Sequence, residues 1–465
     1  MTERPAYNMR YIWLVTLVSA MGGLLFGYDW VVIGGAKPFY EKFFNLTTPS
    51  QIGWAMSSAL VGCLFGALLS GGLSDRFGRK KLLILAAFLF TVTGILTALA
   101  PDFTFFIANR LLGGVAIGLA SNLSPMYIAE ISPAATRGKF VSVNQLTIVI
   151  GILAAQLTNW LIARPVPSGA TAADILASWN GQTGWRWMFG AEAVPALLFF
   201  MLMFLVPESP RWLVKNGRND EAERVLARVG GPGFAAEALA DIRATLAAGE
   251  IGRVRYRDLL EPGLTRVLLI GIVLAVYQQW SGINVIFYYA QEIFTAAGYG
   301  VSDVLFNIVI TGTVNLIFTL VAIRLVDRRG RKPLMLAGSA GLAVVFGLIG
   351  ASYAAGSRGL HILVLVVVAM ALYALSLAPV TWVLLSEIFP NRIRGAAMSV
   401  STFALWSACF VLTYTFPLLN KGVGPARTFW LYAGISVLGF LFIKSRVRET
   451  KGKTLEQIER ELVDR

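Results

Sequence analysis

Residues 75–81 read DRFGRKK and residues 327–333 read DRRGRKP, so one charged motif occurs twice, with an offset of 252 between Asp75 and Asp327. Each copy stands between two apolar runs. Because about 20 apolar residues are enough to cross a bilayer, each motif reads as a short connection between two transmembrane helices. The repetition predicts a chain built from two related halves.

Two further pairs of charged motifs recur in the same order. The segment AEISPAATRG returns as SEIFPNRIRG at an offset of 257, and PESPRWL corresponds to RETKGKTL at an offset of 241. Six helices duplicated in parallel orientation are typical of transporters that bind their substrate midway through the membrane, between the two halves.

The acidic residues in these motifs predict more than topology, since Asp and Glu contribute little to the orientation of a membrane protein. We expect a cytoplasmic gate in which carboxylates and guanidiniums of the two halves pair when that side closes and separate when it opens. The alternative is that the motifs serve only to orient the helices. The gate residues are Asp75, Arg79, Glu130, Arg137, Glu208, Asp327, Arg331, Glu387, Arg394 and Glu449.

Composition supports a membrane protein. Hydrophobic residues make up 56% of the chain and charged residues 14%, with a mean hydropathy of +0.66, which excludes a water-soluble fold of this length. We predict an all-α integral membrane fold of twelve transmembrane helices in two six-helix halves. The spans lie near 11–36, 51–74, 82–100, 103–131, 140–163, 186–206, 266–290, 303–326, 333–354, 360–388, 396–419 and 427–444.

Basic residues set the expected orientation. With the N-terminus in the cytoplasm, 32 of the 40 Lys and Arg residues fall in inner segments and 7 in outer ones, so both termini are expected to be cytoplasmic. The predicted domains are the first half (1–206), a cytoplasmic helical linker (207–264), the second half (265–447) and a cytoplasmic tail (448–465).

Three ionisable residues lie within predicted spans, where charge is costly and usually functional. Asp29 is eight residues from Lys37 at the outer end of its span, and Arg110 is eight residues from Asp102 at the outer end of another. A rise of 1.5 Å per residue places both about 12 Å deep, so they can meet, and places Glu192 about 9 Å deep.

Two interpretations of the Asp29–Arg110 pair remain open. An Asp that loses its Arg partner in a dry bundle would take up a proton, and would release it on regaining the partner, which makes a proton switch. Alternatively, the pair is a permanent bridge that holds two helices together.

The motifs GLSDRFGRKK, PESPRWL, the paired E-x6-RG segments, QQWSGIN and ETKGKTL together resemble the sugar porter family of the major facilitator superfamily, over essentially the whole chain. Among its members, the chain is most similar to the bacterial D-xylose/proton symporters. The resemblance implies a multi-pass protein of the bacterial inner membrane that is not an enzyme. It implies symport of a monosaccharide, D-xylose first and D-glucose or another hexose next, by alternating access. The expected partners are the sugar, the proton and the bilayer, with no cofactor, metal or nucleic acid, and with a functional monomer.

Amide side chains suit a neutral sugar because they both donate and accept hydrogen bonds, and aromatic faces suit the apolar side of its ring. Gln278 and Gln279 lie near the middle of the seventh span, and Gly282 in QQWSGIN favours a helix break beside a cavity. By resemblance, the sugar contacts are Gln145, Gln278, Gln279, Asn284, Tyr288, Asn315 and Trp382, while Phe26 and Trp406 shape the pocket and Asp29 in the GYD motif is the proton site. Arg110 and Glu192, the other two intramembrane charges, are expected to take part in proton coupling with Asp29. For a single intramembrane amide, an interhelical hydrogen bond is the usual alternative.

Three positions depart from the family pattern. Leu405 stands where the xylose symporters have Gln, Ala378 where they have Gly, and Trp30 where they have a small residue. These departures leave the sugar open. Two other functions also remain open, a facilitative uniporter without proton coupling and a sugar sensor that does not transport.

Overall fold

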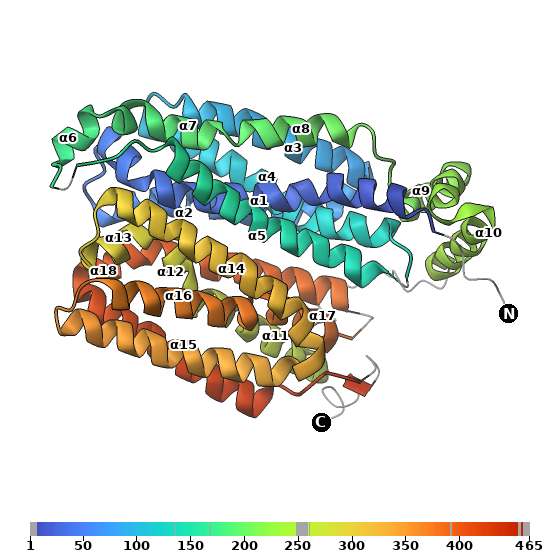
Figure 1. The fold of residues 1–465 in the computed structure, drawn as a ribbon. Coiled ribbons are helices and arrows are strands. Elements are labelled where there is room, and N and C mark those ends of the chain that lie inside the picture. The colour runs from blue at the N-terminus through green and yellow to red at the C-terminus, as the bar shows by residue number, and fades with distance from the viewer. Residues whose placement is uncertain are drawn as a thin grey trace.

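The computed structural model describes residues 7–134, 136–167, 169–247, 259, 261–390, 393–453 and 457–458 of the chain. They form two helical halves that lie side by side along their length (Figure 1). The first half contains α1 (Met9–Phe43), α2 (Pro49–Phe77), α3 (Arg79–Ala98), α4 (Phe103–Ile131), α5 (Arg137–Ile162), the short α6 (Ala172–Ala177), a π-helical turn (Asn180–Gly184), α7 (Trp185–Gly190) and α8 (Ala193–Met203).

The second half is built from broken and unbroken helices. Its elements are α11 (Pro262–Trp280), α12 (Ile283–Tyr288), α13 (Ala290–Ala296), α14 (Val301–Arg329), α15 (Arg331–Ala354), α16 (Leu360–Leu375), α17 (Leu377–Ile388) and α18 (Arg394–Arg446). Eleven helical stretches in the described part of the chain are long and apolar enough to cross a membrane. One of them, α18, contains two predicted spans that join across a kink at Gly424. The twelve-span fold is therefore confirmed.

Helices α9 (Pro210–Lys215) and α10 (Asn219–Ala247) connect the halves at one end of the bundle, called the linker end below (Figure 1). They have a small apolar core of their own, which includes Trp212, Leu226 and Leu239. The segment before α1 is tied to this unit, since the Asn8 N–H donates to the Val229 carbonyl at 2.8 Å. The other end, where α6 and α13 lie, is called the loop end.

Three of the predicted spans are interrupted, and the interruptions position polar groups inside the bundle. The span predicted near 186–206 begins earlier, with the π-helical turn, and α7 is separated from α8 by a turn at residues 191–192. The seventh span breaks at Gly282, as predicted, where φ is +92°, a conformation that glycine adopts readily. The tenth span breaks at Ser376, whose backbone is not helical.

Candidate functional site

The intramembrane ion pair predicted from helix depth is present. Asp29 of α1 and Arg110 of α4 are 2% and 3% exposed, and the Arg110 guanidinium donates to an Asp29 carboxylate oxygen. Arg110 also donates to the Asp29 backbone carbonyl at 3.3 Å. A guanidinium that binds both the side chain and the backbone of one residue holds α4 to α1 at a fixed register.

Glu192 adds a second carboxylate beside this pair. It lies in the turn between α7 and α8, is buried, and interacts electrostatically with both Asp29 and Arg110. Its Oε1 has no hydrogen-bond partner among the described residues. One guanidinium cannot neutralise two ionised carboxylates in a dry environment, so the three groups together can hold a proton.

An amide cluster occupies the break of the seventh span. The Gln279 side chain donates to Gln278 Oε1 at 3.2 Å, and Asn284 donates to Gln279 Oε1 at 2.6 Å. Gln278 in turn donates to the carbonyls of Leu377 and Ala378, at 3.1 and 3.2 Å. Those carbonyls lie beside the break of the tenth span, so Gln278 joins the two interrupted helices of the second half. The chain of amides ends at Asn284 Oδ1, a buried acceptor with no partner among the described residues.

Aromatic side chains cover this cluster from the first half. The Phe26 ring on α1 lies 5.7 Å from Trp406, and Trp30 on α1 lies 5.3 Å from Phe287 and 5.8 Å from Tyr288, centroid to centroid. Tyr288 also lies near Arg110 and Asp29. The ion pair of the first half and the amide cluster of the second thus meet at one aromatic contact.

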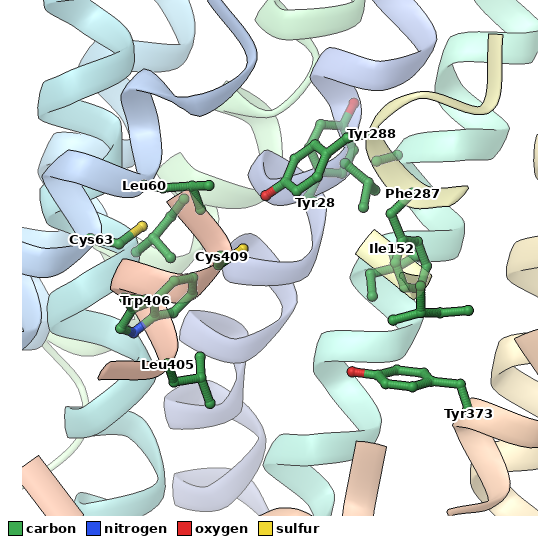
Figure 2. Packing of buried hydrophobic residues seen from close by; sticks show 14 of the residues in the cluster. Tyr28, Leu60, Cys63, Ile152, Phe287, Tyr288, Tyr373, Leu405, Trp406 and Cys409 are labelled. Atoms are coloured by element: carbon green, nitrogen blue, oxygen red, sulfur yellow. The ribbon is translucent and has the colours of Figure 1, made fainter. Parts of the chain in front are cut away.

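Figure 2 shows the buried residues at this junction. Leu60 and Cys63 of α2 lie on the same side as Trp406 and Cys409 of α18, two helices that pack against each other. Leu405 is buried near Trp406, so the position where the resemblance expects Gln contributes only an apolar surface.

The remaining predicted sugar contacts are less constrained. Gln145 on α5 and Trp382 on α17 are half-buried, and Asn315 on α14 is buried. No side-chain hydrogen bond joins any of the three to another described residue. Their side-chain donors and acceptors are not committed to holding the fold.

At the loop end, the halves are joined by a buried charge cluster that the sequence reasoning missed. Lys37 of α1 binds Glu41 on the next turn at 2.7 Å and also donates to Glu292 of α13 in the other half. Close by in the same end of the bundle, the hydroxyls of Ser50 and Tyr414 lie 2.8 Å apart across the halves. The i, i+4 spacing of Lys37 and Glu41 was a readable signal, but nothing in the sequence pointed to Glu292 as their partner.

At the linker end, the charged motifs of the first half, which recur in the same order in the second half, form one network within that half. Arg79 makes two 3.0 Å bonds to the Glu130 carboxylate and one of 3.1 Å to Asp75. Glu208 accepts from the Arg79 and Lys80 backbone N–H groups, at 3.0 and 3.1 Å, and so caps the start of α3.

The second half repeats this arrangement. Arg331 binds Glu387 at 2.9 Å, and Glu449 accepts from the Arg331 and Lys332 backbone N–H groups at 3.0 Å each, capping α15. The duplicated hydroxyls match as well, since Ser209 donates to Glu130 and Thr450 to Glu387.

The carboxylates and guanidiniums of these two networks therefore pair inside their own halves in this conformation, among the residues described. Arg137 is exposed, Arg394 donates to the Phe389 carbonyl at 3.2 Å, and the side chain of Asp327 lies outside the described residues. Pairing across the halves in a state closed at the linker end stays a prediction.

The two capping carboxylates differ in their proton affinity. Burial raises the pKa of Glu208, and the N–H groups of Ser209, Lys80 and Arg79 offset this only in part. Burial acts on Glu449 in the same direction but is outweighed there by the N–H groups of Lys451, Arg331, Lys332 and Thr450, so the pKa of Glu449 is lowered. The carboxylate of Glu449, which is less buried than that of Glu208, therefore stays ionised to a lower pH.

Comparison with known proteins gives concordant results. Residues 15–462 match the family model described as "Sugar (and other) transporter". The chain is 41% identical to the D-xylose-proton symporter of Escherichia coli (strain K12), covering 97% of this chain and 96% of that protein, and 40% identical to the arabinose-proton symporter of Bacillus subtilis (strain 168), covering 98% and 96%. The solved inward open conformation of the xylose transporter XylE from E. coli matches with a TM-score of 0.84 and 39% identity, over 97% of this chain and all of that one.

Proposed function

The chain belongs to the sugar transporter family, which makes it a membrane transporter and not an enzyme, and from that membership we propose that it is a proton-coupled symporter of a monosaccharide. The observation that carries the proposal is the buried Asp29–Arg110 ion pair, which has a second carboxylate, Glu192, beside it and the Tyr288 ring of the other half within electrostatic range. A buried acid with a partner that it can exchange for a proton is what coupling requires.

The coupling step follows from the position of Asp29 between two aromatic contacts. Phe26 and Trp30 flank it on α1 and touch Trp406 and Tyr288 of the second half. When a proton neutralises the carboxylate, Arg110 loses its counter-charge and can turn to Glu192, which frees α1 to move against α12. Sugar bound at the amide cluster also shifts the equilibrium of the contact between α1 and α12. The proton and the sugar therefore act on the same two-state element.

The substrate class follows from the amide cluster. The unpaired Asn284 Oδ1 accepts a hydroxyl hydrogen, and Gln145 and Asn315 offer uncommitted donors and acceptors from the facing helices. No charged side chain belongs to this cluster, which suits a neutral polyol. D-xylose is the first choice, in line with the relatives named above, and D-glucose or another hexose is the second because Leu405 lacks a polar group.

The orientation belongs to the same proposal. We place the linker end in the cytoplasm of a bacterial cell, with the protein in the inner membrane as a functional monomer. The closed loop end, joined through Lys37 and Glu292, and the similarity to an inward open conformation support a state that faces the cytoplasm.

The decisive experiment measures uptake of labelled D-xylose and a panel of hexoses into proteoliposomes that contain the purified full-length protein. A membrane potential of 100 mV supplies about 2.3 kcal/mol per proton, enough for roughly 50-fold accumulation of a co-transported sugar. We expect the wild type to concentrate sugar under an inward proton gradient and to acidify the lumen as it does so. Asp29→Asn should abolish accumulation while sugar exchange across the membrane continues.

Two results would reject proton coupling or transport. Accumulation that ignores the proton gradient, or that is unchanged in Asp29→Asn, would leave a facilitative uniporter. Sugar binding without exchange in either direction would leave a sensor. Asp102→Asn serves as the matched control, because this carboxylate only caps α4 through the Phe105 N–H, 2.9 Å away.

A further inference from the structure

A basic cavity lies at the linker end of the second half, away from the ion pair and the amide cluster. It encloses about 230 Å³ where α11, α15 and α18 come together. Four of its lining residues are cations, Arg266, Lys332, Arg446 and Arg448, and none of its lining residues is acidic. Such a concentration of positive charge in a hollow favours an anionic ligand.

Two of these cations are available to a ligand. Arg266 and Arg446 are exposed, and neither forms an ion pair or a side-chain hydrogen bond with another described residue. Lys332 is partly used, since its ammonium donates to the Lys444 carbonyl at 3.0 Å. Guanidinium groups bind phosphate through two parallel hydrogen bonds, which makes Arg the usual residue for this purpose.

The first half shows that the fold does not need these cations. At the offset of 241 residues, Leu205 and Pro207 stand where the second half has Arg446 and Arg448. Lys80 of the first half nevertheless donates to the Phe204 carbonyl at 2.9 Å, just as Lys332 donates to Lys444. Both halves therefore have this lysine-to-carbonyl contact at the corresponding corner of the bundle. Only the corner of the second half also carries the arginines. An orienting role alone explains the number of inner cations but not their collection around one cavity.

The surface next to the cavity is apolar on the side that faces the membrane. On α11, Leu269 and Val273 are exposed and follow Arg266 at i+3 and i+7, along one face of the helix. On α18, Leu438 and Leu441 are exposed and precede the cavity residue Ser445 by seven and four positions. Because α11 and α18 pack together, these residues lie on neighbouring helices beside the basic cavity, and they are called the apolar strip below.

We propose that this cavity binds the headgroup of an anionic phospholipid of the cytoplasmic leaflet. The phosphate pairs with Arg266 and Arg446, and the acyl chains lie on the strip formed by Leu269, Val273, Leu438 and Leu441. Basic pockets between transmembrane helices on the cytoplasmic side are suited to such headgroups. The proposal depends on a phosphate attached to acyl chains, because exposed apolar residues lie within two helical turns of the cavity residues Arg266 and Ser445.

Native mass spectrometry of the full-length protein in detergent tests the proposal, with dioleoylphosphatidylglycerol as the probe. We expect one tightly bound copy in the wild type. Arg266→Gln with Arg446→Leu should weaken its binding about tenfold or more. Arg446→Leu with Arg448→Pro gives this corner the residues that the first half carries. We expect this variant to fold and to weaken binding similarly. Arg324→Gln with Arg328→Gln, which removes two exposed cations of the same end outside the cavity, should change binding less than twofold.

Two further binding measurements, with a zwitterionic lipid and with a soluble phosphate, distinguish the possible ligands. Dioleoylphosphatidylcholine should bind far more weakly, and glycerol 3-phosphate should compete only at much higher concentration than the lipid. Equal binding of phosphatidylcholine would overturn the charge recognition, and competition by glycerol 3-phosphate at equal concentration would replace the lipid with a soluble phosphate. Undiminished phosphatidylglycerol binding in both cavity variants would sink the proposal, provided that they elute as the wild-type monodisperse species.

Discussion

The Arg110 side chain shows how much one residue can contribute when charge is buried. Its guanidinium faces Asp29 and Glu192, and it also lies 5.6 Å from the centre of the Phe189 ring. Removing only one member of a buried ion pair leaves an uncompensated charge, which is far more costly than removing both. The environment of Arg110 therefore depends on its partners being ionised, and so on pH.

We predict that Arg110→Leu lowers the free energy of unfolding by about 3–5 kcal/mol at neutral pH, because two carboxylates then share a dry site without a cation. The loss should shrink as the pH falls, since protonation removes the stranded charges. Adding Asp29→Asn to Arg110→Leu should restore much of the stability. Thermal unfolding in detergent between pH 5 and pH 8 measures these effects, and a double variant no more stable than the single one would contradict them.

Glu208 and Glu449 provide a second test at single residues. The lowered pKa of Glu449 means that its ionised form is favoured in the fold, so its contribution is present at neutral pH and is lost as the pH falls below the unfolded value of about 4.3. The raised pKa of Glu208 means the reverse, so its ionisation weakens the fold as the pH rises above that value. Glu449→Gln should therefore lower the melting temperature at pH 7 more than Glu208→Gln does, and the difference should narrow toward pH 4. Equal losses at pH 7 would contradict the assignment.

At the level of elements, the repeated motif works as a joint between two helices. Gly78 before α3 and Gly330 before α15 have φ of +96° and +90°, and the carboxylates of Glu208 and Glu449 sit where a Cβ would be. Each glycine thus allows a carboxylate to reach the N-terminus of the next helix, where it satisfies N–H groups and complements the helix dipole. This explains why the glycine and the distant glutamate are repeated together.

Gly78→Ala should destabilise the protein by about 1–3 kcal/mol, from backbone strain and from displacement of Glu208. Gly72, near the C-terminal end of α2 and at the same end of the bundle, is the matched control, because a Cβ there meets nothing within 4 Å. Gly72→Ala should be neutral or stabilising by about 0.5–1 kcal/mol, since alanine favours a helix over glycine. Chemical denaturation of the two variants side by side measures the contrast, and equal effects would show that Gly78 has no special role.

The sequence could predict what depends on one helix and could not predict what depends on packing. Asp29 and Arg110 were matched by their depth alone, and Gly282 was expected to break its helix, because rise per residue and backbone freedom are local properties. The contact of Glu292 with Lys37 was missed because it depends on how α13 packs against the first half. A second break, at Tyr289, separates α13 from α12 and sets its direction. Trp30 was noted only as a departure, although its ring contacts both Phe287 and Tyr288 of α12.

On the scale of the whole molecule, the two ends of the bundle are held differently. At the loop end, Lys37 and Glu292 link the halves through buried charge, whereas at the linker end the described motif residues pair within their own halves. Alternating access requires that the links at the two ends form in different states. The Lys37–Glu292 pair is then a lock on the loop end, and its strength contributes to the balance between the two states.

Glu292→Gln should weaken this lock and shift the population toward states open at the loop end. Allosteric equilibria commonly change by about 1–3 kcal/mol for such a contact, or roughly 5- to 150-fold. Cysteines placed at Ser50 and Tyr414, whose hydroxyls lie 2.8 Å apart across the halves, report the opening through a lower rate of disulfide cross-linking by an added oxidant, in a protein whose buried Cys63 and Cys409 are replaced. Glu41→Gln is the matched control, because it removes a carboxylate from the same lysine while the link between the halves remains. If both variants slow cross-linking equally, the effect comes from the charge of the cluster and not from the link between the halves, whereas slower cross-linking in Glu292→Gln alone assigns the lock to that one contact.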